Sequence, residues 1–317
     1  MMKRVTHLAF LSCIAAVLCG TAPGRTPVPK AATTGVLLMA HGGSKDWNAQ
    51  VVRVAAEVNR SMPTEVAFGM ADRTTLQRGI DELTARGAKR IVAVPLFTSS
   101  YSSVIECTKY LLGLRHDPPP ELSSFTMLAM PKMTGMTAHP AADASPSEAP
   151  ALPGPVRSAV PLRMTPALDD HPLVAQILED RAAAIAKDPP RDVLILVAHG
   201  PTDDRENALW LASMKALARQ IAAHTRYARI EYVTLRDDAD APVRDKANAA
   251  LRRKVEAADA EGYHALVVPL LLSYGGIENG LRRRLDGLEH TLSPQALLPD
   301  PRMARWVLDR ASLPASK

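Results

Sequence analysis

The sequence predicts an α/β protein with two halves, each a parallel sheet flanked by helices, related by internal duplication. Three observations favour this fold class: short apolar runs alternate with longer amphipathic stretches, the alternation occurs twice, and segments of the first half match segments of the second. The 317 residues are 47% hydrophobic and 22% charged, which is typical of a globular protein with room for two modest domains.

Both halves contain the elements that a covered parallel sheet needs. The strand candidates are short apolar runs, at residues 35–40, 65–69 and 90–97 in the first half and 192–198, 229–235 and 265–272 in the second. The helix candidates are amphipathic stretches between them, at residues 47–60, 74–86, 206–223 and 242–260. Gly87 and Gly262 follow two of these helices, where a left-handed C-cap is expected.

The repeat is supported by matching motifs as well as by the pattern of elements. Three pairs of segments match: 37–43 (LLMAHGG) with 195–201 (ILVAHGP), 92–101 with 266–276, and 167–182 with 296–311. Pro95 aligns with Pro269 in the second pair, and Pro172 aligns with Pro301 in the third. We expect each member of the third pair to form the last helix of its own half.

The N-terminus predicts a secretory signal peptide over residues 1–22. Lys3 and Arg4 precede a short apolar run at 8–20, and small residues follow it. This run is shorter than the ~20 apolar residues that cross a bilayer, so a permanent anchor is the weaker alternative and no permanent span is expected after cleavage. The protein is therefore expected to be exported, to the periplasm.

Composition sets the remaining boundaries. We expect a linker at 23–34, an N-terminal half at 35–187 and a C-terminal half at 191–313, with a flexible Pro/Ala insertion at 140–161 inside the first half. The insertion has almost no large apolar residue, so it cannot bury enough surface to offset its ordering entropy. Without the leader, Cys107 is the only cysteine, which excludes an internal disulfide.

The charge of the chain argues against a nucleic-acid partner. Lys3 and Arg4 account for two of the five formal positive charges, which leaves a surplus of about three after cleavage. No zinc-finger, basic-zipper or RNA-binding aromatic motif is present in the sequence. We therefore expect a small-molecule or ion ligand.

His41 and His199 are the first candidates for chemistry. Each directly follows the first predicted strand of its half, and ligands of open α/β sheets bind outside the carboxyl ends of the strands. A histidine there can also be a structural hydrogen-bonder, but its recurrence in both halves favours a functional role. Gly42 and Gly43 could cradle an anion, although neither the dinucleotide nor the P-loop glycine pattern is present.

The chain resembles the class II tetrapyrrole chelatases in four features. These are AHGG and AHGP after the first strands, VPLF and VPLLLS in the third strands, LDDHP at 168–172, and the twofold repeat. The similarity is to the sirohydrochlorin cobaltochelatase and ferrochelatase group. It covers nearly all of the chain after the leader except the Pro/Ala insertion. It implies two flavodoxin-like halves facing each other, with a planar tetrapyrrole in the cleft between them.

The resemblance also implies an activity and ligands. A divalent metal ion, Co²⁺ or Fe²⁺, would be inserted into sirohydrochlorin, and the family's first-strand histidine maps onto His41 or His199. A neutral imidazole can hold such an ion or accept a pyrrole proton, so both residues are candidate metal ligands and bases. The expected partners are a tetrapyrrole and a metal ion, and homodimer formation is left open.

The sequence departs from the family in the loops after the third strands, where relatives carry a second histidine. Here the loops read TSSYSSVIE and LSYGGIENG. Glu278 is a candidate proton acceptor. The equal alternative is a structural role at the start of a helix, where its negative charge interacts favourably with the helix dipole. Tyr101 could ligate a haem iron or serve in packing. The tetrapyrrole-contacting positions expected in these loops and after His41 are Gly42, Gly43, Tyr101, Ser103, Gly275 and Gly276.

Other histidines and methionines carry less weight. His171 precedes Pro172 at a helix start and aligns with Asp300, which indicates a shared capping role. His264 begins a strand, away from the carboxyl edge. Methionines recur every third residue, as a stripe, at Met127, Met130, Met133 and Met136, followed by His139. Thioethers suit soft ions such as Cu(I), although Met127 and Met130 also fit a strand at 125–130.

Three functions therefore compete at this stage. The first is a chelatase that uses His41, His199 and Glu278. The second is a non-catalytic exported protein of the same fold that binds haem or a transition metal, which the leader and the missing third-strand histidine both favour. The third is an interaction protein that retains the duplicated fold without ligand chemistry.

Overall fold

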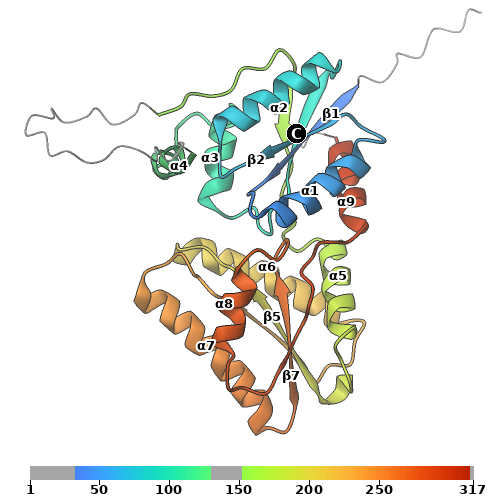
Figure 1. Ribbon diagram of the computed structural model, residues 1–317, viewed down its shortest axis with the longest axis vertical. Coiled ribbons are helices and arrows are strands. Elements are labelled where there is room, and N and C mark those ends of the chain that lie inside the picture. Colours follow the sequence, from blue (N-terminus) through green and yellow to red (C-terminus); the bar gives the residue numbers. More distant parts are fainter. Residues whose placement is uncertain (1–32, 130–151, 315–317) are drawn as a thin grey trace, which may run out of the picture. The chain divides into compact units, whose positions relative to one another are not determined.

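The computed structural model describes residues 33–129 and 152–314 of the chain, and these form two four-stranded parallel sheets. The strands of the first sheet are, in spatial order, β2 (Thr64–Phe68), β1 (Thr34–Ala40), β3 (Arg90–Pro95) and β4 (Leu162–Met164). Those of the second are β6 (Arg229–Thr234), β5 (Asp192–Ala198), β7 (His264–Leu270) and β8 (Thr291–Leu292). The same order therefore occurs twice, and the predicted fold class is confirmed (Figure 1).

Helices cover both faces of the two sheets. In the first half they are α1 (Lys45–Val58), α2 (Arg73–Ala85), α3 (Ser103–Leu111) and α4 (Leu122–Ala129). Further along the chain follow α5 (Pro172–Ala183), the 3₁₀ turn η1 (Pro189–Arg191), α6 (Asp204–Ala222), α7 (Ala241–Ala260), α8 (Ile277–Arg284) and α9 (Arg302–Ser312). The six strands and four helices predicted between residues 35 and 98 and between 192 and 272 are present, with their ends shifted by one or two residues at most. The last helices begin later than the matched segments at 167–182 and 296–311, at Pro172 and Arg302.

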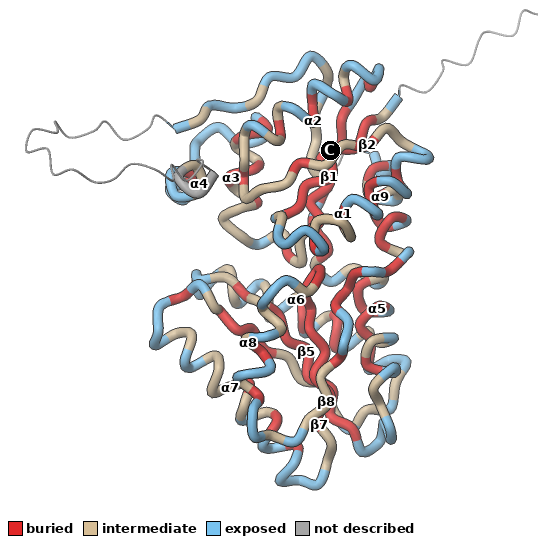
Figure 2. Tube along the Cα trace, viewed as in Figure 1, coloured by how far each residue is buried: buried red, intermediate tan, exposed pale blue. Residues whose placement is uncertain are grey.

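The central strands are buried on both faces. In β1, Leu38 and Ala40 face the apolar cluster under α1, whereas Leu37 and Met39 face the cluster under α2. Strand β5 alternates in the same way, and all seven of its residues are buried. Figure 2 shows the buried positions concentrated in the strands. This double burial explains the near-continuous apolar runs in the sequence.

The last helix of each half is exchanged between the sheets. Helix α5 packs against α6 and β7 of the second half, and α9 packs against α1 and β3 of the first (Figure 1). The prediction that each closes its own half is therefore wrong. Side chains fix the exchange: Arg181 of α5 donates to the carbonyls of Ala296 and Leu297 at 2.9 and 3.3 Å, and Arg163 of β4 donates to that of Ala311 at the end of α9 at 2.9 Å.

The C-terminal part of the predicted flexible insertion, residues 152–161, is held against helix α2 by hydrogen bonds, so the prediction of flexibility is wrong for this part. The Arg73 side chain of α2 donates to the carbonyl of Gly154 at 2.8 Å, and Gln77 exchanges two hydrogen bonds with the backbone of Arg157. Val156 packs on the cluster under α2 and α3. These partners offset the ordering cost that the composition alone suggests. Residues 140–151 lie outside the described residues, as do the leader and most of the linker.

The strand considered at 125–130 is also wrong, because residues up to Ala129 belong to helix α4. Leu122 N–H donates to the carbonyl of Pro119 at 3.1 Å, so the proline-rich turn starts a helix. Three methionines of the stripe and His139 lie outside the described residues. No helix within residues 33–129 and 152–314 has the length and apolar character of a membrane span.

Cys107 and His264 both have structural surroundings. Cys107 is a buried free thiol in the core of the first half, where burial raises its pKa to about 12. His264 begins β7, and its Nε2 lies 2.7 Å from the hydroxyl of Thr291 on the neighbouring strand β8. The predicted structural role of His264 is confirmed.

His171 is the N-cap of α5, which confirms its predicted capping role. Its Nδ1 accepts a hydrogen bond from the N–H of Leu173 at 3.2 Å, and its ring meets Trp306 of α9 edge-on, with 6.5 Å between centroids. The aligned Asp300 likewise accepts from the N–H of Arg302 at 3.0 Å. Burial lowers the pKa of His171, and the guanidinium of Arg310 lowers it further, against Asp309 and Asp170.

We expect His171 to make the folded protein less stable as the pH is lowered. Because its pKa is lower in the folded than in the unfolded chain, where it is about 6.5, its contribution is complete above that pH and is lost as the pH falls below it. His171→Asn keeps a capping acceptor but does not titrate. Thermal unfolding between pH 7.5 and 5 should show a smaller decrease in Tm for this variant than for the wild type. Parallel curves would contradict the assignment.

Candidate functional site

His41 and His199 occupy equivalent places at the carboxyl ends of the two sheets. Ala40 ends β1 and Ala198 ends β5, so each histidine is the first residue beyond a central strand. Gly42 and Gly200 follow with φ of 84° and 77°, a left-handed turn that glycine adopts without strain. Each imidazole is thus presented by the same local backbone.

The His41 turn leaves one ring nitrogen available. Its Nδ1 lies 2.5 Å from the carbonyl oxygen of Gly42, and this contact places the proton on Nδ1. Among residues 33–129 and 152–314, Nε2 makes no hydrogen bond, and His41 is exposed. Gly43 N–H donates to the Asn48 side chain at 2.8 Å, and Ser44 caps α1. The turn is therefore anchored to the first turn of α1.

His199 has a different partner. Its Nε2 lies 3.5 Å from the carboxylate of Asp238, in the loop after β6, and its side chain is 28% exposed. A carboxylate beside Nε2 favours the proton on that nitrogen, which leaves Nδ1 as the acceptor. Asp238 was not among the predicted site residues; the acidic run DDAD at 237–240, one residue beyond a predicted strand, is the signal that indicates it. The two histidines therefore offer opposite nitrogens.

Arg236 holds the loop that follows His199. It is buried with a left-handed φ of 55°. Its guanidinium donates to the carbonyls of Pro201, at 3.0 Å, and Thr202, and to the Asp204 carboxylate at 2.6 Å. One side chain from the loop after β6 thus fixes the turn between β5 and α6.

The loop after β3 carries Tyr101 and Ser103. Tyr101 is 41% exposed, and Ser103 is the first residue of α3. Asp169 binds this loop through two hydrogen bonds: its carboxylate oxygens accept from the N–H and the hydroxyl of Ser100, each at 2.6 Å. The loop is thereby anchored to the segment that precedes α5.

The loop after β7 contains Gly275, Gly276 and Glu278. Glu278 Oε2 accepts the N–H groups of Gly275 and Gly276 at 3.0 and 2.8 Å, and the residue lies in the first turn of α8. Burial opposes the shift, but these backbone hydrogen bonds prevail and lower the pKa of Glu278. Its carboxylate therefore caps the loop, as the structural alternative expects, and its role as a proton acceptor stays a prediction.

Loops of the two halves meet at these positions. The indole Nε1 of Trp210, in α6, donates to the carbonyl of Tyr101 at 2.6 Å. Gly275 packs on Trp47 of α1, so closely that an added Cβ would lie 3.2 Å from Trp47 Cδ1. Within the described part of the chain, no three His, Cys, Asp or Glu side chains are grouped so that they could hold a metal ion. The third-strand loop of each half thus contacts the helix that follows the histidine turn of the other half, and the described residues hold no preformed three-residue metal site.

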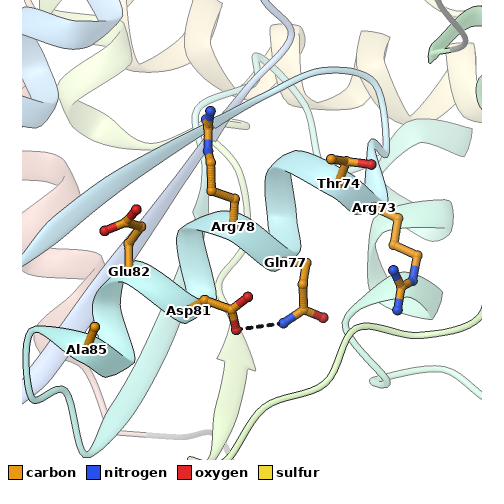
Figure 3. A pocket seen from close by; sticks show the side chains of 7 residues that line it. All are labelled: Arg73, Thr74, Gln77, Arg78, Asp81, Glu82 and Ala85. Atoms are coloured by element: carbon orange, nitrogen blue, oxygen red, sulfur yellow. Dashed lines mark hydrogen bonds between the residues drawn. The ribbon is translucent and has the colours of Figure 1, made fainter.

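A separate hollow of about 580 Å³ lies along α2 (Figure 3). Its lining comes from that helix alone: Arg73, Thr74, Gln77, Arg78, Asp81, Glu82 and Ala85. Gln77 donates to the Asp81 carboxylate across it at 2.9 Å. None of the predicted site residues lines this hollow.

Two parallel sheets with the same strand order, each flanked by helices, give the chain a chelatase-like α/β fold. Residues 35–185 match the CbiX family model. The resemblance to the class II tetrapyrrole chelatases is thereby confirmed over this segment.

Solved structures share the fold over nearly the whole chain. SirB from Bacillus subtilis with Fe³⁺ is 16% identical at a TM-score of 0.56, covering 88% of this chain and 94% of SirB. The sirohydrochlorin chelatase SirB from Bacillus subtilis subspecies spizizenii in complex with cobalt is 14% identical at 0.52, covering 88% and 94%. CbiX, the terminal enzyme of siroheme biosynthesis in denitrifying bacteria, is 17% identical at 0.50, covering 89% and 100%. No curated protein sequence matches the chain.

We expect Arg236→Met to destabilise the protein by about 2–4 kcal/mol, because it leaves the carbonyls of Pro201 and Thr202 without their donor. Chemical denaturation measures this loss. Arg226→Met, at an exposed arginine, is the matched control and should change the free energy of unfolding by less than about 0.5 kcal/mol. Equal losses in both variants would show that Arg236 does not fix the loop.

Proposed function

We propose that this protein is a metal chelatase that inserts Co²⁺ or Fe²⁺ into a sirohydrochlorin-type tetrapyrrole. The observation that carries the proposal is the pair of equivalent histidines, each at the end of a central strand and each with one available ring nitrogen, on a chelatase fold. The cobalt-bound and iron-bound SirB structures support the class of metal.

The chemistry needs groups that hold a metal ion and groups that take up protons. A neutral imidazole binds borderline divalent ions, and insertion releases two pyrrole protons that a nearby base must accept. His41 Nε2 and His199 Nδ1 are the available lone pairs, and the contact of His199 Nε2 with Asp238 orients that ring. Glu278 remains a further candidate acceptor, although one of its oxygens already caps the loop.

The ligand set suits a metal that is a substrate. Only one or two imidazoles would bind the ion, so the remaining coordination positions stay open for water and then for the four pyrrole nitrogens. A closed protein site would hold the ion too firmly to pass it on.

The second candidate is a non-catalytic haem-binding or transition-metal-binding protein of the same fold. Its supporting observation is Tyr101, which is 41% exposed in the loop where the family resemblance implies a histidine; tyrosine is a known haem ligand. Export to the periplasm, which we also propose, favours this alternative.

Cell fractionation with mass analysis of the N-terminus tests the export, because an uncleaved cytoplasmic chain would contradict the leader at 1–22.

The chelatase proposal predicts a rate that depends on both histidines. With Co²⁺ and sirohydrochlorin under anaerobic conditions, absorbance should show insertion above the spontaneous rate, and His41→Ala or His199→Ala should lower it at least about tenfold. His224→Ala, an exposed histidine beyond α6, is the matched control and should leave the rate unchanged. A wild-type rate equal to the spontaneous rate, together with tight haem or metal binding, would favour the carrier.

A further inference from the structure

Trp47 lies between two loops that come from different halves. An added Cβ at Gly43, in the His41 turn, would lie 3.2 Å from Trp47 Cγ, and one at Gly275 would lie 3.2 Å from Cδ1. Both distances are shorter than ordinary van der Waals contact, and the indole is 9% exposed. The same side chain therefore fills the space between the histidine turn of the first half and the third-strand loop of the second.

Trp210 makes the reciprocal contact. Its indole N–H donates to the carbonyl of Tyr101, in the third-strand loop of the first half, at 2.6 Å. Pro95 and Pro269 align in the repeat, and Tyr101 and Gly275 each follow their proline by six residues. The same loop position in each half is thus contacted by a tryptophan from the helix that follows the histidine turn of the other half.

We propose that Trp47 and Trp210 are positioning residues, a reciprocal pair that fixes each third-strand loop to the histidine-bearing side of the opposite half. The consequence for metal binding rests on the proposed function. The predicted effect on the position of His41 does not, because it follows from contacts within the protein.

The connection from Trp47 to His41 is short and stiff. Ser44 Oγ accepts from Trp47 N–H at 3.2 Å, and Gly43 N–H donates to Asn48 Oδ1 at 2.8 Å. A shift of the indole therefore displaces Gly43, two residues after His41. In the second half, the Glu278 carboxylate accepts two backbone hydrogen bonds from Gly275 and Gly276, so these hydrogen bonds oppose a movement of the Gly275 loop away from Trp47. Steric pressure at Gly275 should thus reach the imidazole of His41.

Gly275→Ala tests this coupling in the full chain. Gly275 does not have a left-handed φ, so the new methyl group acts through its contact with Trp47 and not through backbone strain. Gly154→Ala is the matched control, because its Cβ would meet nothing within 4 Å. Trp47→Phe is a second variant that relieves the contact instead of compressing it.

The readout is NMR of protein with isotope-labelled histidine and tryptophan. In Gly275→Ala and in Trp47→Phe the ring signals of His41, identified by their loss in His41→Ala, should shift. The signals of His264, which contacts Thr291, should not. Gly154→Ala should shift neither. Unmoved His41 signals in folded Gly275→Ala and Trp47→Phe would overturn the proposal, whatever happens to metal binding.

A cobalt titration separates this inference from the proposed function. Gly275→Ala and Trp210→Phe should each weaken Co²⁺ binding about five- to tenfold, and the effect of Gly275→Ala should vanish when His41 is already alanine. Shifted His41 signals without Co²⁺ binding at His41 would support the positioning pair and remove the metal site from the proposed function. A loss of affinity that persists without His41 would overturn the coupling to this histidine.

Discussion

The double burial of the central strands is the constraint on which the rest of the structure depends. All seven residues of β5 are buried, as are the last six of β1. From the second residue of each of these strands to its carboxyl end every side chain is apolar or glycine, and in both halves the first polar side chain beyond that end is histidine. Parallel pairing directs the carboxyl ends of all four strands of a sheet to one edge, so the loops with Tyr101 and Glu278 lie along the edges that carry the histidines.

The helix exchange joins these two edges into one unit. Helix α9 buries Trp306 completely, and its apolar residues belong to the same cluster as those of β1, β5 and α5. Separating the halves would expose this shared core and break the hydrogen bonds of Arg163 and Arg181. The exchanged helices therefore oppose large movements of the halves, and the tryptophan contacts determine the finer spacing of the loops.

The sequence predicted what local patterns encode. Strands buried on both faces and amphipathic helices have distinct periods, so their positions and the histidine turns were found. The exchange was not predictable, because the periodicity of 167–182 indicates an apolar face but not the sheet that covers it. Asp238 was missed because its proximity to His199 depends on the pairing of β6 with β5. The ordered part of the insertion depends on Arg73 and Gln77, about 80 residues earlier.

The repeat is symmetric in its backbone but not in its chemistry. His41 contacts a backbone carbonyl, which cannot change its charge, whereas His199 faces a carboxylate. Under the proposed function, each imidazole is a candidate both to hold the incoming ion and to accept a pyrrole proton. Two halves with the same strand order thus present two imidazoles that differ in their neighbours.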